Sequence, residues 1–114
     1  MVDLSAKNIS KGLLDFQGVG RRFELSKIYF ADQPHMLIDD YGHHPTEISA
    51  TISALKENTI GKLYVIFQPH RYTRTKNGFE DFRASLSKAD ETIVVDIYPA
   101  GEEPIPGVSS KNFE

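Results

Sequence analysis

Three short apolar runs, separated by two segments of helical periodicity, constrain the fold of this chain more than any other feature. The runs span 36–38, 63–67 and 92–98. One helical segment begins at Pro45, carries Ile48, Ile52 and Leu55 and ends before Gly61, and the other spans 77–88. Runs that are apolar without alternation are typical of strands buried on both faces of a parallel sheet. The order therefore predicts an α/β fold with β-α-β-α-β connectivity and a mostly parallel sheet. Such sheets usually contain more strands, so we expect this one to be truncated.

Apolar residues within the two helical segments recur at the spacing of one helix face. Before them, the sequence predicts a helix over 4–16, followed by Gly18 and Gly20, a strand at 28–30 and a turn at 32–34. The apolar positions that define the three helices are Ile9, Leu13, Phe16, Ile48, Ile52, Leu55, Phe79, Phe82 and Leu86.

Composition excludes several classes of function. The chain contains no cysteine, which excludes disulfides, thiolate catalysis and cysteine-based zinc sites. A net charge of −3 argues against a nucleic-acid partner. No apolar run reaches the roughly 18 residues of a membrane span, and the first ten residues lack a basic region followed by an apolar stretch. We therefore expect a protein with no membrane partner and no secretory signal.

Polar loops follow each of the three predicted strands. Ligands of open α/β sheets bind at the carboxyl ends of the strands. This rule selects residues 39–44, 68–75 and 99–107, and the first two loops hold most of the unusual side chains. We therefore expect the functional site at this edge of the sheet.

The first loop, DDYGHHP, predicts a nucleotide or phosphate site. Asp40 could accept hydrogen bonds from ribose hydroxyls, and His43 could donate to a phosphate or contact a metal-bound water. Gly42 permits a close backbone approach, and Pro45 begins a helix whose N-terminus favours anions. The structural alternative is that a side chain of this loop caps that helix.

The second loop, QPHRYTRT, predicts an anion site. His70, Arg71 and Arg74 follow a strand directly, and arginine is well suited to bidentate binding of carboxylate or phosphate. The alternative is a surface loop whose arginines pair with Glu80 and Asp81.

Other motifs are weaker. The Gly18–Gly20 pair follows a helix and lacks the third glycine of a dinucleotide fingerprint, so it is more typical of a helix end and hinge. No GxxxxGK[ST] phosphate loop occurs. A zinc site remains an alternative, with ligands among four histidines, His35, His43, His44 and His70.

Four segments together resemble one family. LLDFQGVGRRFE (13–24), DDYGHHPTEISATISAL (39–55), VIFQPHRYTRT (65–75) and VVDIYPAGEEPIPGV (94–108) are similar to the Mur ligases, in particular to their alanine-adding members. The resemblance implies a fragment of a cytoplasmic, ATP- and Mg²⁺-dependent ligase. This ligase joins L-alanine to UDP-N-acetylmuramate through an acyl phosphate, in peptidoglycan precursor synthesis. The alternatives are a murein-peptide recycling ligase of the same family and a standalone nucleotide-binding module.

The resemblance also implies an organisation and a set of roles. Residues 1–17 would end a central ATPase domain, 18–26 would form a hinge, and 27–114 would begin a Rossmann-like, three-layer carboxy-terminal domain. The fragment alone would be inactive, because the phosphate loop and the UDP site of the family lie outside it. Tyr41 and His43 would line the reaction centre, Asp40, His43 and one of Arg21 and Arg22 would contact ATP, and His70, Arg71 and Arg74 would face the amino acid and the product.

Overall fold

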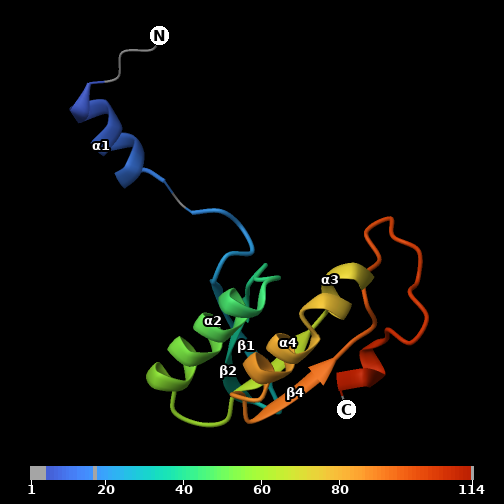
Figure 1. Cartoon of the computed structure of the whole chain (residues 1–114). Helices are drawn as coiled ribbons and strands as arrows, with labels where there is room; N and C mark the ends of the chain where they lie inside the picture. Colours follow the sequence, from blue (N-terminus) through green and yellow to red (C-terminus); the bar gives the residue numbers. More distant parts are fainter. Residues whose placement is uncertain (1–4, 17, 114) are drawn as a thin grey trace. The chain divides into compact units, whose positions relative to one another are not determined.

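The computed structural model describes residues 5–16 and 18–113, which belong to two compact units, Met1–Tyr41 and Gly42–Glu114 (Figure 1). Residues 1–4, 17 and 114 lie outside the described residues. They include parts of the segments predicted at 1–17 and 27–114, and the first residue of the helix predicted over 4–16.

The first unit begins with helix α1 (Ala6–Leu14), which confirms a helix within the predicted range. Ser5 is its N-cap and its hydroxyl accepts a hydrogen bond from the Asn8 N–H at 3.3 Å. The apolar residues Ile9 and Leu13 are exposed, and no described residue of α1 is buried. The helical periodicity therefore marks an apolar stripe that this unit does not cover.

A two-stranded antiparallel hairpin completes the first unit. Strand β1 (Glu24–Phe30) pairs with β2 (Gln33–Asp39), and Phe30 lies opposite Gln33. The turn falls at Ala31 and Asp32, whose φ values of 48° and 60° suit the two-residue turns of hairpins. The predicted turn at 32–34 is therefore misplaced. The prediction that 36–38 forms a buried parallel strand is wrong, because β2 is antiparallel and almost wholly exposed.

The second unit alternates helices and parallel strands. The predicted helix over 77–88 is in fact preceded by a further short helix, in a stretch that we expected to be a loop. Strands β3 and β4 pair in parallel, with Tyr64 opposite Glu91, and an isolated bridge joins His70 to Tyr98 beyond their ends. The elements are α2 (Pro45–Asn58), β3 (Tyr64–Phe67), α3 (Tyr72–Asn77), α4 (Phe79–Leu86), β4 (Glu91–Val94) and the 3₁₀ helix η1 (Ser110–Phe113).

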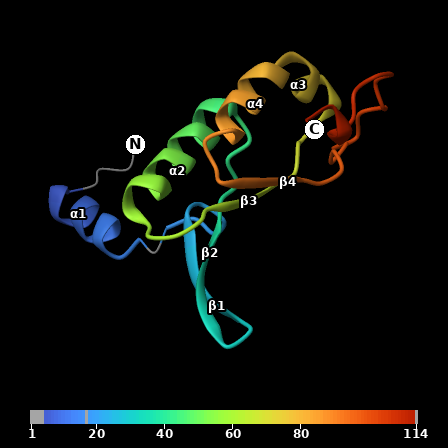
Figure 2. The ribbon, with the colours of Figure 1, turned by 90° about the horizontal axis from the view of Figure 1, so that it is seen from below.

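The core of the second unit lies between the helices and one face of β3 and β4. Figure 2 shows α2 and α4 side by side on the same side of these strands. Phe67 packs against Phe82 with ring centroids 5.3 Å apart. The opposite face is apolar but exposed. The core contains Ile48, Ile52, Phe67, Phe82 and Leu86, and the exposed face carries Tyr64, Ile66, Ile93 and Val95.

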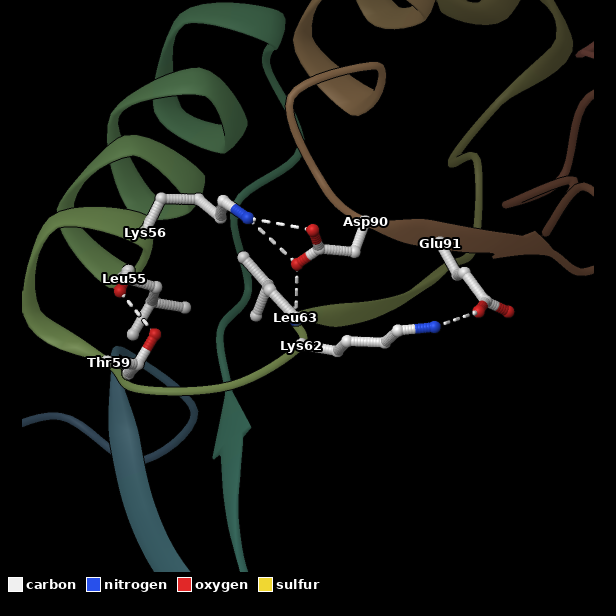
Figure 3. A network of polar contacts seen from close by, with 7 residues as sticks. All are labelled: Leu55, Lys56, Thr59, Lys62, Leu63, Asp90 and Glu91. Carbon is white, nitrogen blue, oxygen red and sulfur yellow. Dashed lines mark hydrogen bonds and ion pairs between the residues drawn. The ribbon is translucent and has the colours of Figure 1, made fainter.

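Asp90 ties the start of the parallel strands to α2 (Figure 3). Its carboxylate accepts hydrogen bonds from the Leu63 N–H at 2.7 Å and from the Lys56 ammonium at 2.8 and 2.9 Å. Beside it, Lys62 and Glu91 form an ion pair at 3.5 Å. The N–H of Leu63 and then Lys56 hold the pKa of Asp90 below its ordinary value. The residue before β3 is thus bonded to a carboxylate that lies 27 residues further along the chain.

These two units confirm the α/β class but only part of the predicted topology. The described residues form two sheets of two strands each. The β1–β2 sheet is antiparallel and the β3–β4 sheet is parallel. None of the helices in the described part of the chain is long and apolar enough to cross a membrane.

Candidate functional site

In the first unit, Arg21 is held at the open end of the hairpin. Its Nε donates to the Asp39 carboxylate at 3.2 Å, and its guanidinium lies 5.6 Å from the centre of the Tyr41 ring. Its backbone N–H donates to Glu24, and its carbonyl accepts from the Tyr41 N–H at 2.7 Å. The structure therefore brings together Arg21 and Tyr41, two of the predicted site residues. The other two in this unit, Arg22 and Asp40, are exposed.

In the second unit, the loop before α2 forms a capping box. His44 is the N-cap, and its Nδ1 accepts from the Thr46 N–H at 3.3 Å. Glu47 accepts from the N–H groups of His43 and His44, both at 3.1 Å. These two hydrogen bonds, His43 first, lower the pKa of Glu47. The capping alternative is therefore realised, with a histidine in the place of the usual serine or threonine.

This capping box bears on the expectation that the start of α2 favours an anion. A phosphate at the start of α2 would need free backbone N–H groups, but those of His43, His44 and Thr46 are already bonded within the chain. His43 is half-buried, and its Nδ1 lies 4.0 Å from Glu47.

His70 lies at the end of β3 and extends the parallel pairing. Its ring stacks on Tyr98 with centroids 5.2 Å apart, and its Nδ1 is buried without a hydrogen-bond partner in the described part of the chain. Burial is the main cause that lowers the pKa of His70, and the charges of Arg74 and Arg71 and the electrostatic interaction with His43 lower it further. His70 is therefore biased towards its neutral form in a cationic surrounding that contains all four predicted residues of this unit.

Arg71 and Arg74 belong to the first turn of α3. Arg71 is the N-cap with φ 75° and ψ 136°, a conformation rare for residues with a side chain. Its N–H donates to the Tyr98 carbonyl at 2.8 Å, and its carbonyl accepts from the buried Thr75 hydroxyl at 2.7 Å. Arg74 is half-buried on the helix. Hydrogen bonds to Tyr98 and Thr75 thus hold the strained backbone of Arg71 at the start of α3.

The partner of Arg71 is a residue that the sequence analysis missed. Its guanidinium lies 4.0 Å from Glu102, and among residues 5–16 and 18–113 neither arginine pairs with Glu80 or Asp81. Glu102 lies in the third strand-end loop, which its Pro and Gly content marked only as a loop. Glu47 was missed as well, although its place three residues after His44 is the signature of a capping box.

The described residues contain no group of three or more histidine, aspartate or glutamate side chains that could hold a metal ion. Arg21 offers an exposed cation suited to phosphate, and Asp40 offers an exposed carboxylate suited to ribose hydroxyls. Mg²⁺ commonly takes few protein ligands and shares phosphate oxygens, so it needs no such cage.

Parallel strands with helices on one face, and a histidine and two arginines at the strand ends, define an α/β domain with a cationic strand-end site. The family described as "Mur ligase, glutamate ligase domain" matches residues 21–113. The chain therefore belongs to the Mur ligase family.

Three curated relatives are each named UDP-N-acetylmuramate–L-alanine ligase. The proteins of Geotalea daltonii, Geobacter sp. (strain M21) and Baumannia cicadellinicola are 49%, 50% and 47% identical to this chain over 110, 111 and 117 residues. Each alignment covers 96% of this chain but only 23%, 23% and 24% of the respective relative. The chain thus spans about a quarter of the length of these relatives.

Proposed function

We propose that this chain is part of a ligase that joins L-alanine to UDP-N-acetylmuramate with ATP, in the cytoplasmic synthesis of peptidoglycan precursors. The observation that carries this proposal is the identity of 47–50% to three ligases of that name across 96% of the chain. The strand-end site supports it, because the amine of the amino acid reacts while its carboxylate stays free, and arginine is well suited to bind such a carboxylate.

The chain would supply the first part of a Rossmann-like, three-layer carboxy-terminal domain over 27–114. The exposed apolar face of β3 and β4 supports this, because such a face normally packs against a further layer. Residues 1–17 would end the preceding ATPase domain, and 18–26 would form the hinge. A φ of 88° at Gly18, which other residues rarely adopt, supports a specialised joint there.

We assign the nucleotide contacts to Asp40, His43 and one of Arg21 and Arg22. When bound, ATP with Mg²⁺ would supply the phosphoryl group that activates the muramyl carboxylate. Asp40 would accept from ribose hydroxyls, and an arginine would balance phosphate charge. Tyr41 and His43 would line the reaction centre.

His70, Arg71 and Arg74 would bind the amino acid and the product. The lowered pKa of His70 supports this assignment, because burial and the two neighbouring guanidinium groups disfavour a further positive charge, as expected of a site that already holds cations for an anionic ligand. Arg74 is our choice for the carboxylate contact, since it is half-buried and forms no ion pair with any residue of 5–16 or 18–113.

Arg74→Lys in the full-length ligase tests this role. Lysine keeps the charge but loses the planar fork, and the lost charged hydrogen bond corresponds to about 1.5–3 kcal/mol. We expect kcat/KM for alanine to fall roughly ten- to hundred-fold while KM for ATP changes much less. Arg83→Lys, at an exposed position on α4, is the matched control. An alanine kcat/KM close to that of the control, or an equal loss for ATP, would refute the carboxylate role.

A further inference from the structure

We propose that Glu102 is a positioning residue of the amino-acid site and that it acts through Thr73 to hold the turn carrying Arg71 and Arg74. This inference rests on the proposed function, because it assumes that these arginines bind the amino acid. It adds a residue from a third loop that neither the sequence motifs nor the comparisons assign to the site.

A tight turn presents Glu102 to α3. The Glu102 N–H donates to the Pro99 carbonyl at 3.0 Å, and the two residues between them, Ala100 and Gly101, have φ values of 49° and 84°. This left-handed pair reverses the chain directly after the strand-end bridge at Tyr98. The half-buried Glu102 side chain is therefore aimed by backbone geometry rather than left on a freely moving loop.

The Glu102 carboxylate makes two hydrogen bonds to one residue of α3. Oε2 accepts from the Thr73 N–H at 3.0 Å, and Oε1 accepts from the Thr73 hydroxyl at 2.6 Å. These bonds hold the pKa of Glu102 below its ordinary value, with the hydroxyl bond contributing most. Thr73 stands between Arg71 and Arg74 in the chain, so a bidentate contact there ties the Glu102 loop to the helical turn that carries both arginines.

The two arginines differ in whether an acidic side chain of the chain lies beside them. Glu102 lies 4.0 Å from the Arg71 guanidinium, whereas Arg74 forms no ion pair with any residue of 5–16 or 18–113. The Glu102 carboxylate thus lies close to the Arg71 guanidinium and is bonded to the first turn of α3. Arg74 is left as the cation that a carboxylate ligand would meet.

The contact can be removed from either side. Glu102→Gln loses the negative charge and one acceptor, and Thr73→Val loses the hydroxyl. Thr73→Ser keeps the hydroxyl and serves as the conservative rescue. Glu103→Gln changes an exposed neighbouring carboxylate and is the matched control. Steady-state kinetics of the full-length ligase, with alanine and ATP varied separately, gives the primary measurement.

We expect Glu102→Gln and Thr73→Val each to raise KM for alanine about three- to ten-fold, with KM for ATP unchanged within about two-fold. The double variant should be no worse than the poorer single variant, because both changes break one contact. Thr73→Ser and Glu103→Gln should stay close to wild type. In NMR spectra of the 114-residue chain, Glu102→Gln should shift the amide signals of Thr73 and Arg74, and Glu103→Gln should not.

The inference is overturned if Glu102→Gln changes alanine kinetics no more than Glu103→Gln does, or if the effects of the two single variants multiply. Equal losses for alanine and ATP would also overturn it, since that is what general damage to the fold produces. Failure of the proposed function is recognised separately. In that case Arg71→Lys and Arg74→Lys would themselves leave alanine kinetics unchanged.

Discussion

Replacing Arg71 by glycine and by alanine separates the strain of its backbone from the function of its side chain. Both variants lose the guanidinium and its ion pair with Glu102. They differ in whether a Cβ must occupy the conformation at φ 75° and ψ 136°. Any difference in stability between the two variants therefore reports on the backbone alone.

The expected difference has two opposing parts. A residue with a side chain in so sparsely populated a region is destabilised by about 1–3 kcal/mol, which glycine would relieve. Glycine also gains about 0.5–1 kcal/mol of conformational freedom in the unfolded chain, which opposes this. With roughly 2 kcal/mol of strain and about 1 kcal/mol of entropy, Arg71→Gly should be more stable than Arg71→Ala by about 1 kcal/mol.

Urea unfolding of the chain, followed by signals of the second unit, measures this difference. At a slope of roughly 1 kcal/mol per molar urea, the midpoint of Arg71→Gly should exceed that of Arg71→Ala by about 1 M. Ala50→Gly, at an exposed position within α2, is the control and should show the opposite sign, because helical backbone favours alanine.

Two outcomes would refute this reasoning. If Arg71→Ala is as stable as Arg71→Gly, the contacts of Arg71 with Tyr98 and Thr75 do not hold a strained conformation. If both variants of the full-length ligase keep wild-type kinetics for alanine, the side chain has no part in binding it. We expect instead that both lose alanine affinity to a similar degree despite their different stabilities.

Asp90→Asn should lower stability at neutral pH, and the difference from wild type should shrink as pH falls through the native pKa of Asp90. The sign follows because that pKa lies below the ordinary 3.8, so the contribution is complete above 3.8 and is lost in more acid solution. Urea midpoints from neutral to acid pH measure it, and a pH-independent difference would contradict it. The 114-residue chain alone should form no amide from ATP, UDP-N-acetylmuramate and alanine, and NMR titration should give an ATP Kd well above about 1 μM. Product from the chain alone would contradict our domain assignment.

Helices α1, α2 and α4 and the parallel strands β3 and β4 could be predicted because each carries an apolar pattern along the sequence. Of the predicted apolar positions of α2 and α4, Ile48, Ile52, Leu55, Phe82 and Leu86 are buried, whereas Phe79 is only half-buried. The run at 63–67 contains β3, and the run at 92–98 overlaps all of β4 except its first residue, Glu91. The pairing of the run at 36–38 was predicted wrongly, because an apolar run does not specify the strand with which it pairs. Pairing with β1 depends on a turn at Ala31 and Asp32, which lacks the usual Asn-Gly or Asp-Gly signal.

The candidate site was predictable to the level of loops but not of contacts. Strand-end geometry selected the loops that hold His70, Arg71 and Arg74, and the structure gathers these residues at one place. Their partner could not be predicted, because the turn that presents Glu102 depends on a left-handed Ala100 as well as on Gly101. The helix α3 was missed because its only buried residue is Thr75, so no apolar periodicity marks it.

The capping box at α2 means that the first turn of this helix is ordered without a ligand. A helix end completed by a phosphate frays whenever the phosphate leaves, and each arrival must order it again. Glu47 completes this end from within the chain, so its ordering belongs to folding and occurs once. In a ligase containing this segment, a ligand that binds beside this helix end would then not have to order the first turn of α2.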